Sequence, residues 1–276
     1  NLTILTGAQA TRILFVDRRA SGAEYRQGGV TKTIKARRGV VLSAGAVQSP
    51  QLLMLSGIGP AEHLRTHGIN ILADSPGVGD NLQDHLQLRL IYRANRPITT
   101  NDELRSLAGR VRMALDWLLF TQGPLAIGIN QAGLFTRVMP DSRTPDIQFH
   151  IATLSADMAG GKVHDYPGFT LSVCQLRPES SGTITLASGD PLAAPLIHAN
   201  YLSRDTDRRC AVAAITFARR LAQTKPLADY VAREELPGRT AESDADLLGF
   251  ARAHGATIFH PAGTCKMGPE DDPQAV

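Results

Sequence analysis

Apolar and polar residues alternate along the first part of the chain, which is typical of strands that bury one face. This alternation predicts strands at residues 2–5, 12–16, 21–25 and 32–36. Gly28 and Gly29 form a turn before the last of them, so the region is expected to be a small antiparallel meander. Residues 40–46 differ because their apolar positions are continuous. That pattern predicts a strand covered on both faces, as in a parallel sheet.

Helix signals follow this region. Ser49 can cap a helix that has Pro50 in its first turn and Gly57 just past its end. A second short helix is predicted at residues 60–67, and a short strand at residues 69–72.

The rest of the chain alternates between strands and helices. Strands are predicted at residues 86–93, 146–153, 169–176 and 182–187. Helices are predicted at residues 102–120, with Asn101 as the cap, and at residues 205–223 and 244–254. Loops separate these strands more often than crossover helices do, which favours an antiparallel sheet with helices on one face. The predicted fold class is therefore α+β, and the turn-rich residues 76–81 are the expected boundary between two lobes.

Composition narrows the classes of function. The net charge is only +3, and the basic residues form no stripe with aromatic residues between them, which argues against nucleic acid as a partner. No apolar run reaches the roughly 18 residues of a transmembrane segment, while peripheral membrane attachment stays open. Cys174, Cys210 and Cys265 are too widely spaced for a disulfide framework or a Cys-x-x-Cys site, which fits a reducing, cytoplasmic compartment.

Four stretches carry chemical signals. Residues 45–59 (GAVQSPQLLMLSGIG) place small residues between a predicted strand and a helix, where a backbone can approach a nucleotide, although a packing turn has the same pattern. Together with residues 1–7 (NLTILTG), 77–85 (GVGDNLQDH) and 259–268 (FHPAGTCKMG), this stretch resembles the glucose–methanol–choline (GMC) oxidoreductase family. Members of that family bind FAD and oxidise alcohols.

The resemblance implies roles for particular residues. The positions that correspond to FAD-binding residues are Ala10, Ala44, Gly45, Thr257, Ile258 and Phe259. His260 falls on the histidine that lies beside the reactive N5 atom of the flavin. A neutral imidazole can accept the hydroxyl proton of an alcohol whose hydride passes to the flavin, so His260 is the expected catalytic base. Pro261 favours an extended backbone at His260, which would project the ring.

The resemblance also indicates a substrate site. His150 stands where the family directs a strand residue toward the substrate, with packing in the sheet as the alternative. Gln131 takes the place of a glutamate found in choline-oxidising relatives, which predicts a neutral alcohol rather than choline, although aromatic faces could still hold a cation. His85 is expected to make a structural hydrogen bond. His63 and His67 have no evident third ligand, so no metal site is predicted.

Residues 1–75 are expected to belong to an FAD-binding domain, residues 76–256 to a substrate-binding domain, and residues 257–276 to the FAD-binding domain again. The Gly-x-Gly-x-x-Gly fingerprint of the family is not in this sequence, and its second catalytic His or Asn would lie beyond Val276. The sequence is therefore expected to be the central and C-terminal portion of a longer enzyme, inactive by itself, with the missing remainder as a partner.

Three functions remain open at this point. The leading one is an FAD-dependent alcohol dehydrogenase or oxidase with a small-molecule alcohol as substrate. The second is a hydroxynitrile lyase, which keeps FAD on the same fold without net oxidation. The third is an isolated substrate-binding lobe with no activity. Nothing in the sequence separates a dehydrogenase from an oxidase, because that depends on the access of oxygen to the reduced flavin.

Overall fold

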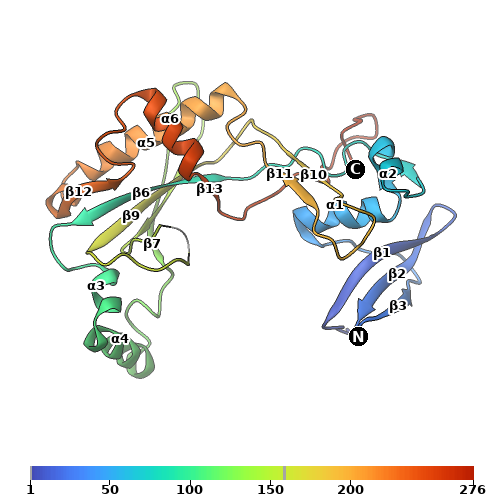
Figure 1. The fold of residues 1–276 in the computed structure, drawn as a ribbon, viewed down its shortest axis with the longest axis horizontal. Coiled ribbons are helices and arrows are strands. Elements are labelled where there is room, and N and C mark those ends of the chain that lie inside the picture. The colour runs from blue at the N-terminus through green and yellow to red at the C-terminus, as the bar shows by residue number, and fades with distance from the viewer. Residues whose placement is uncertain (1, 158–159) are drawn as a thin grey trace. The chain divides into compact units, whose positions relative to one another are not determined.

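The computed structural model describes residues 2–157 and 160–276, so Asn1 of the first motif lies outside the described residues. The chain divides into two compact units, each assembled from segments that are distant in sequence (Figure 1). Unit 1 comprises Asn1–Asp84, Ser180–Tyr201 and Phe259–Val276, and unit 2 comprises His85–Glu179 and Leu202–Ile258.

Unit 1 begins with the predicted meander. Strands β1 (Ala8–Val16), β2 (Arg19–Gln27) and β3 (Val30–Lys35) form a three-stranded antiparallel sheet, as the alternating pattern indicated. The strand predicted at residues 2–5 is wrong, because these described residues are exposed and pair with no strand. An apolar alternation becomes a strand only where a neighbour satisfies its backbone groups.

The continuous apolar run at residues 40–46 does not form the predicted buried strand. Val41 is 90% exposed, and the backbone stays irregular until helix α1 (Gly45–Leu55) begins. A strand covered on both faces needs paired neighbours and a layer on each side. Within the part of the chain that the structure describes, no strand pairs with residues 40–44.

Helix α1 also starts earlier than predicted. Ser49 lies inside the helix rather than at its cap, and its hydroxyl accepts a hydrogen bond from the Ala44 amide at 3.1 Å. Pro50 is likewise internal, where it cannot donate to the carbonyl four residues before it. Gly57, with φ of 89°, follows the helix as predicted.

The second helix and the strands around it are short. Helix α2 (Ala61–Thr66) ends before Gly68 as predicted. The strand predicted at residues 69–72 is displaced: β5 is Ala73–Asp74, which pairs in parallel with β4 (Ile58–Gly59). The displacement follows from backbone pairing, which apolar pattern alone does not fix.

Unit 1 is completed by a segment that sequence reasoning placed elsewhere. Strands β10 (Thr183–Thr185) and β11 (Leu196–His198) form a two-stranded antiparallel sheet, and the Ile184 amide donates to the Gly79 carbonyl at 2.7 Å. One small cluster of buried apolar side chains lies in this unit: Met54, Leu55, Leu64, Val78 and Leu186.

Unit 2 is built on one six-stranded antiparallel sheet, which confirms the predicted architecture. Its order is β12–β6–β9–β8–β7, with β13 also paired to β6. The strands are β6 (Leu86–Ala94), β7 (Asn130–Thr136), β8 (Ile147–Ala152), β9 (Gly168–Gln175), β12 (Val231–Leu236) and β13 (Ala256–Thr257). Helices α5 (Asp205–Ala222) and α6 (Asp244–His254) lie on one face of the sheet (Figure 1).

The single helix predicted at residues 102–120 is two helices. Helix α3 (Thr100–Arg105) and helix α4 (Leu107–Phe120) are separated by Ser106, whose extended backbone and side-chain hydroxyl cap α4. Asn101 is not the cap. Its side chain is fully buried, and Thr99 forms the capping box of α3. A second capping residue within the pattern therefore broke the helix.

Candidate active site

The segment that carries His260 runs antiparallel to the motif at residues 77–85 within unit 1. The Gln83 amide donates to the Ala262 carbonyl at 2.9 Å, and the Ala262 amide donates back at 2.8 Å. The Gly79 amide also donates to the Thr264 carbonyl at 2.9 Å. Two motifs about 180 residues apart in the sequence thus form one hydrogen-bonded pair of segments.

A third motif, residues 45–59, is linked to the His260 segment by a hydrogen bond to helix α1 that depends on Pro50. Because Pro50 has no amide hydrogen, the Ala46 carbonyl loses its expected helical donor. The Thr264 hydroxyl donates to this carbonyl instead, and Thr264 is 1% exposed. The Thr264 hydroxyl therefore replaces the amide donor that Pro50 lacks, and this hydrogen bond links helix α1 to the His260 segment.

Asp84 holds the backbone of His260. One carboxylate oxygen of Asp84 accepts from the His260 amide at 3.0 Å, and the other accepts from the Tyr201 hydroxyl. Hydrogen bonds to a charged carboxylate are stronger than those between neutral groups. Sequence reasoning missed Asp84 and Tyr201, because only the fold brings residues from three distant segments together.

The residue before the histidine has an unusual backbone. Phe259 has φ of 62°, which is uncommon for a bulky side chain and costs roughly 1–2 kcal/mol. Its side chain is 79% exposed, and His260 is also exposed. The strained backbone at Phe259 accompanies two side chains that are exposed on unit 1. Such backbone strain is typical of functional sites.

Three of the predicted FAD-binding positions, Ala10, Ala44 and Gly45, leave room for a ligand in unit 1. Ala44 and Gly45 are exposed at the start of α1, Gly45 has φ of 79°, and a Cβ atom there would meet nothing within 4 Å. The first turn of α1 has no acidic side chain, so its amide groups can face an anionic or polar group. Ala10 is half-buried on β1, beside a register shift between Ala10 and Arg12. Small side chains and open backbone at these positions fit FAD.

Two of the other predicted FAD-binding residues lie in unit 2. Thr257 is in β13, paired with Leu86 of β6, and Ile258 is the last residue of unit 2. Phe259 and His260 belong to unit 1. The predicted set is thus divided between the two units at the Ile258–Phe259 bond.

His150 lies on the polar face of the large sheet. Its neighbour Phe149 points into the core, so His150 points to the opposite face, where the cross-strand partner is Ser172. Ser172 pairs in turn with Arg89, whose pKa is lowered by its burial. Hydrogen-bonding side chains line this face on three adjacent strands: Gln87, Arg89, Gln148, His150, Thr170 and Ser172.

Both ring nitrogens of His150 contact glutamine side chains. Arg89 donates to the Gln87 side-chain oxygen at 3.2 Å, so the Gln87 nitrogen faces His150 Nδ1, 3.4 Å away. His150 Nε2 lies 3.0 Å from the Gln148 side-chain nitrogen. His150 is therefore held between the side-chain amides of Gln87 and Gln148 on this face of the sheet.

Gln131 is at an irregular point of the neighbouring strand. The register of β7 with β8 shifts between Asn130 and Ala132, so Gln131 is the additional residue of a β-bulge, and its side chain is exposed. It lines a cavity of about 380 Å³ together with the Glu103–Arg112 ion pair. Gln131 and His150 thus lie on adjacent strands of unit 2.

The remaining histidines have structural contacts. His85 Nδ1 donates to the Gln175 carbonyl at 2.6 Å, as predicted. His63 Nε2 accepts from the Leu186 amide at 3.0 Å, and burial together with His67 lowers the pKa of His63. In residues 2–157 and 160–276, no group of three or more His, Cys, Asp or Glu side chains is arranged to hold a metal ion.

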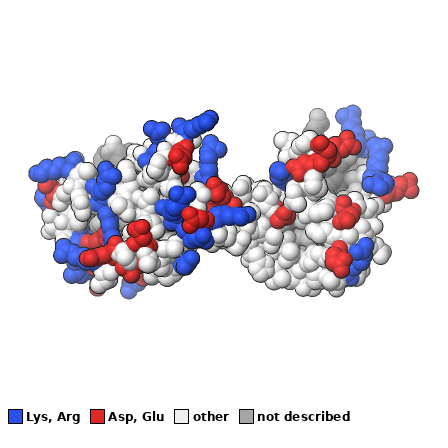
Figure 2. Space-filling model, turned by 90° about the horizontal axis from the view of Figure 1, so that it is seen from above, with Lys and Arg blue, Asp and Glu red and all other residues white. Residues whose placement is uncertain are grey.

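Charged residues of both signs are interspersed on the face of the molecule in Figure 2, and no single basic stripe crosses it. None of the helices that the structure describes has the length and apolar character needed to cross a bilayer.

Comparison with known proteins identifies the family. Residues 1–87 match the N-terminal profile and residues 178–276 the C-terminal profile of the family described as GMC oxidoreductase. The chain is 39% identical over 271 residues to the oxygen-dependent choline dehydrogenase of Brucella canis, covering 97% of this chain and 48% of that enzyme. It is 37% identical over 278 residues to an alcohol dehydrogenase (acceptor) of Pseudomonas putida, covering 100% of this chain and 50% of that enzyme.

Solved structures agree. A formate oxidase of Aspergillus oryzae studied for modification of its FAD superposes with a TM-score of 0.86 and 26% identity, over 94% of this chain and 50% of that chain. Pyridoxine 4-oxidase from Mesorbium loti superposes with a TM-score of 0.81 and 26% identity, over 99% of this chain and 49% of that chain. The chain spans about half the length of the curated relatives it matches. It belongs to the GMC oxidoreductase family, whose cofactor is FAD.

Proposed function

We propose that this chain forms part of an FAD-dependent enzyme that oxidises a neutral alcohol to an aldehyde or ketone, with His260 as the base. The observation that carries the proposal is the hydrogen-bonded pairing of residues 79–84 with residues 260–264, which fixes the backbone of His260 and leaves its side chain exposed. The reaction is proposed for the chain together with the residues that its relatives have beyond the matched half.

In the proposed reaction, the residues of this chain accept the hydroxyl proton of the alcohol and position the catalytic base. FAD, when bound, supplies the acceptor for the hydride that leaves the carbinol carbon. The neutral imidazole of His260 accepts the hydroxyl proton of the same alcohol, so that a carbonyl can form. Asp84 acts as a positioning residue, because it holds the His260 amide and thereby limits where the ring can lie. Ala10, Ala44 and Gly45 would hold the adenosine part of FAD, and Thr257, Ile258 and Phe259 would lead to the flavin.

Two side chains of unit 2 support a proposal for the substrate class. His150 presents an imidazole held by Gln87 and Gln148 on the polar face of the sheet, and Gln131 on the adjacent strand provides an uncharged amide where choline-oxidising relatives have a glutamate. Neither side chain offers a negative charge to a quaternary ammonium group, so we propose a neutral alcohol in preference to choline.

The test uses the full-length protein with bound FAD, mixed anaerobically with a neutral primary alcohol or with choline. Bleaching of the flavin spectrum by the neutral alcohol at a higher kcat/KM than by choline supports the proposal. A Gln131→Glu variant should shift this ratio toward choline. Product formation with the flavin still oxidised would instead identify a lyase, and equal turnover of both substrates would contradict the substrate assignment. Reoxidation of the bleached flavin by air would identify the enzyme as an oxidase.

A further inference from the structure

Arg89 places a positive charge on the polar face of the large sheet, the face that carries His150. Its neighbours in β6, Leu88 and Leu90, point into the core, so Arg89 points to the opposite face. The register sets Arg89 opposite Ser172 and Ser172 opposite His150, which forms one row across β6, β9 and β8. Neighbouring strands lie about 5 Å apart, so the backbones of Arg89 and His150 are roughly 10 Å apart.

A buried glutamine connects the two side chains. Arg89 Nε donates to the Gln87 side-chain oxygen at 3.2 Å, and the Gln87 side-chain nitrogen lies 3.4 Å from His150 Nδ1. Gln87 is only 7% exposed, which limits the freedom of its side chain. The guanidinium group and the imidazole therefore contact the two ends of one amide group, and a substrate that contacts His150 lies close to the charge of Arg89.

Arg89 has no compensating carboxylate among the described residues. Within residues 2–157 and 160–276 it forms no ion pair, and only its Nε has a hydrogen-bond acceptor. The side chain is half-buried, and this burial lowers the pKa of Arg89. A guanidinium group nevertheless stays protonated at neutral pH. A full positive charge therefore lies in surroundings that screen it less than water does.

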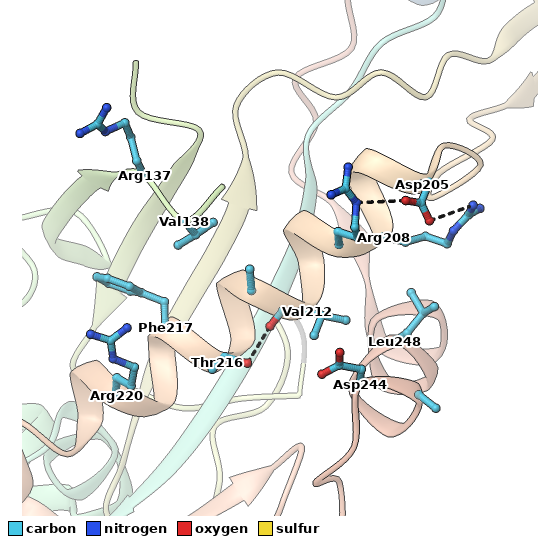
Figure 3. A pocket seen from close by; sticks show the side chains of 13 residues that line it. Arg137, Val138, Asp205, Arg208, Val212, Thr216, Phe217, Arg220, Asp244 and Leu248 are labelled. Carbon is cyan, nitrogen blue, oxygen red and sulfur yellow. Dashed lines mark hydrogen bonds and ion pairs between the residues drawn. The ribbon is translucent and has the colours of Figure 1, made fainter. Parts of the chain in front are cut away.

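Several other arginines of unit 2 lie beside carboxylates. In a cavity of about 790 Å³ along α5, on the side of the sheet that the helices cover, Asp205 lies 3.5 Å from Arg208 (Figure 3). On the polar face itself, Arg93 is four residues beyond Arg89 on β6 and forms an ion pair with Glu235. Arg93 therefore offers a matched comparison: the same residue type, strand and face, but with a balanced charge.

We infer that Arg89 is a specificity-determining residue that excludes cationic alcohols from the site beside His150. The inference rests on the proposed function and deepens it: Gln131 removes an attraction for a cation, and Arg89 adds a repulsion. Like charges repel more strongly in a half-buried site than in water, and a quaternary ammonium group cannot lose its charge by deprotonation. A neutral alcohol of the same shape meets no such repulsion.

The test compares choline with 3,3-dimethyl-1-butanol, in which a carbon atom replaces the charged nitrogen. The full-length protein with bound FAD is mixed anaerobically with each alcohol at limiting concentration, and the rate of flavin bleaching is measured. The ratio of the rate constant for the neutral alcohol to that for choline should fall about tenfold in Arg89→Gln, which corresponds to about 1.4 kcal/mol. Arg89→Lys keeps the charge, so its ratio should stay within about threefold of the original protein.

The matched control is Arg93→Gln, because Glu235 already balances the charge that this change removes. Its ratio should stay within about twofold of the original protein. Equal FAD content in all variants separates altered selectivity from lost folding. An unchanged ratio in Arg89→Gln, an equal fall in Arg93→Gln, or an equal fall in Arg89→Lys would overturn the inference.

The methyl ethers of the two alcohols separate this inference from the proposed function. They have no hydroxyl proton to lose, so their dissociation constants report binding alone, through the change in the flavin absorption spectrum. A tenfold change in the ratio of these constants in Arg89→Gln supports the inference without any turnover. Bleaching by neither alcohol would contradict the proposed function, whereas an unchanged ratio of ether dissociation constants in Arg89→Gln would contradict the role of Arg89.

Discussion

Different interactions stabilise the folded structures of unit 2 and unit 1. In unit 2, fully buried side chains from the sheet and from α5, such as Phe149, Leu171 and Ile215, belong to one continuous core. In unit 1 the buried cluster is small, and segments distant in sequence meet through backbone hydrogen bonds at close approaches such as Gly79. His260 belongs to the second kind of structure.

This difference has a consequence for function. A core of interdigitated side chains is stable against surface changes and tolerates variation outside it. A unit held by close backbone contacts instead depends on a few exact positions, because a single added Cβ atom can prevent two segments from meeting. The position of His260 should therefore respond to substitutions that hardly change the stability of unit 2.

The largest effect is expected in the core of unit 2. Phe149→Ala should lower the free energy of unfolding of this unit by about 3–5 kcal/mol, because it removes a fully buried ring. Urea unfolding monitored by the fluorescence of Trp117, the single tryptophan, measures it. Phe135→Ala, on the same sheet but 57% exposed, is the control and should cost less than about 0.5 kcal/mol. Similar losses of unfolding free energy in both variants would contradict the conclusion that a buried core stabilises unit 2.

In unit 1 a glycine should matter as much as a core residue. Gly79 has φ of 84°, and a Cβ atom there would lie 2.2 Å from the Ile184 carbonyl oxygen. Gly79→Ala should therefore destabilise unit 1 by about 2–4 kcal/mol, from backbone strain and the forced separation of the two segments. Gly28→Ala also places alanine at a positive φ, but in open space, and should cost only about 1 kcal/mol. Hydrogen exchange of unit 1 amides measures both, and equal losses would argue against the close approach.

Replacing Asp84 should loosen the backbone of His260 without unfolding either unit. Asp84→Asn removes the charge and turns the new side-chain NH₂ group toward either the His260 amide or the Tyr201 hydroxyl, both of which are donors. The hydrogen of the His260 amide should therefore exchange on the order of tenfold faster. Tyr201→Phe, which leaves the Asp84–His260 hydrogen bond in place, should have a smaller effect. Unchanged exchange in Asp84→Asn would remove Asp84 as a positioning residue.

The smallest effect is a pH dependence in unit 1. The pKa of His63 is lowered in the folded chain, so the unfolded chain binds the proton more readily. The contribution of neutral His63 should be complete above a pH of about 6.5 and be lost as the pH falls toward the lowered value, by less than about 1 kcal/mol because the ring is partly exposed and screened. Thermal unfolding between neutral and mildly acidic pH should show this slope, and His63→Gln should flatten it. An unchanged slope would assign it to another group.

The same comparison explains what the sequence could predict. The elements of unit 2 follow from periodicity, because each strand and helix buries one face against a core, as at residues 86–93 and 205–223. In unit 1 the strands predicted at residues 2–5 and 40–46 did not form, because a strand depends on pairing partners that the local pattern does not specify.

The candidate site was predictable only in part. The motif around His260 carries enough specific residues to identify the family. The hydrogen bonds of His260 to Asp84 and of Ala46 to Thr264 were not predictable, because they join segments that are about 180 to 220 residues apart. Pro50 offered the one local signal, since a proline inside a helix leaves a carbonyl in need of another donor.

The central claim is that His260 accepts the alcohol proton while its backbone is held by unit 1. The most direct measurement is the anaerobic rate of flavin bleaching by a neutral alcohol in the full-length protein and its His260→Gln variant, with FAD content determined for both. The account predicts equal FAD content and a rate lowered by roughly 10²–10⁴-fold in the variant, the usual contribution of a general base. An unchanged rate at equal FAD content would contradict it.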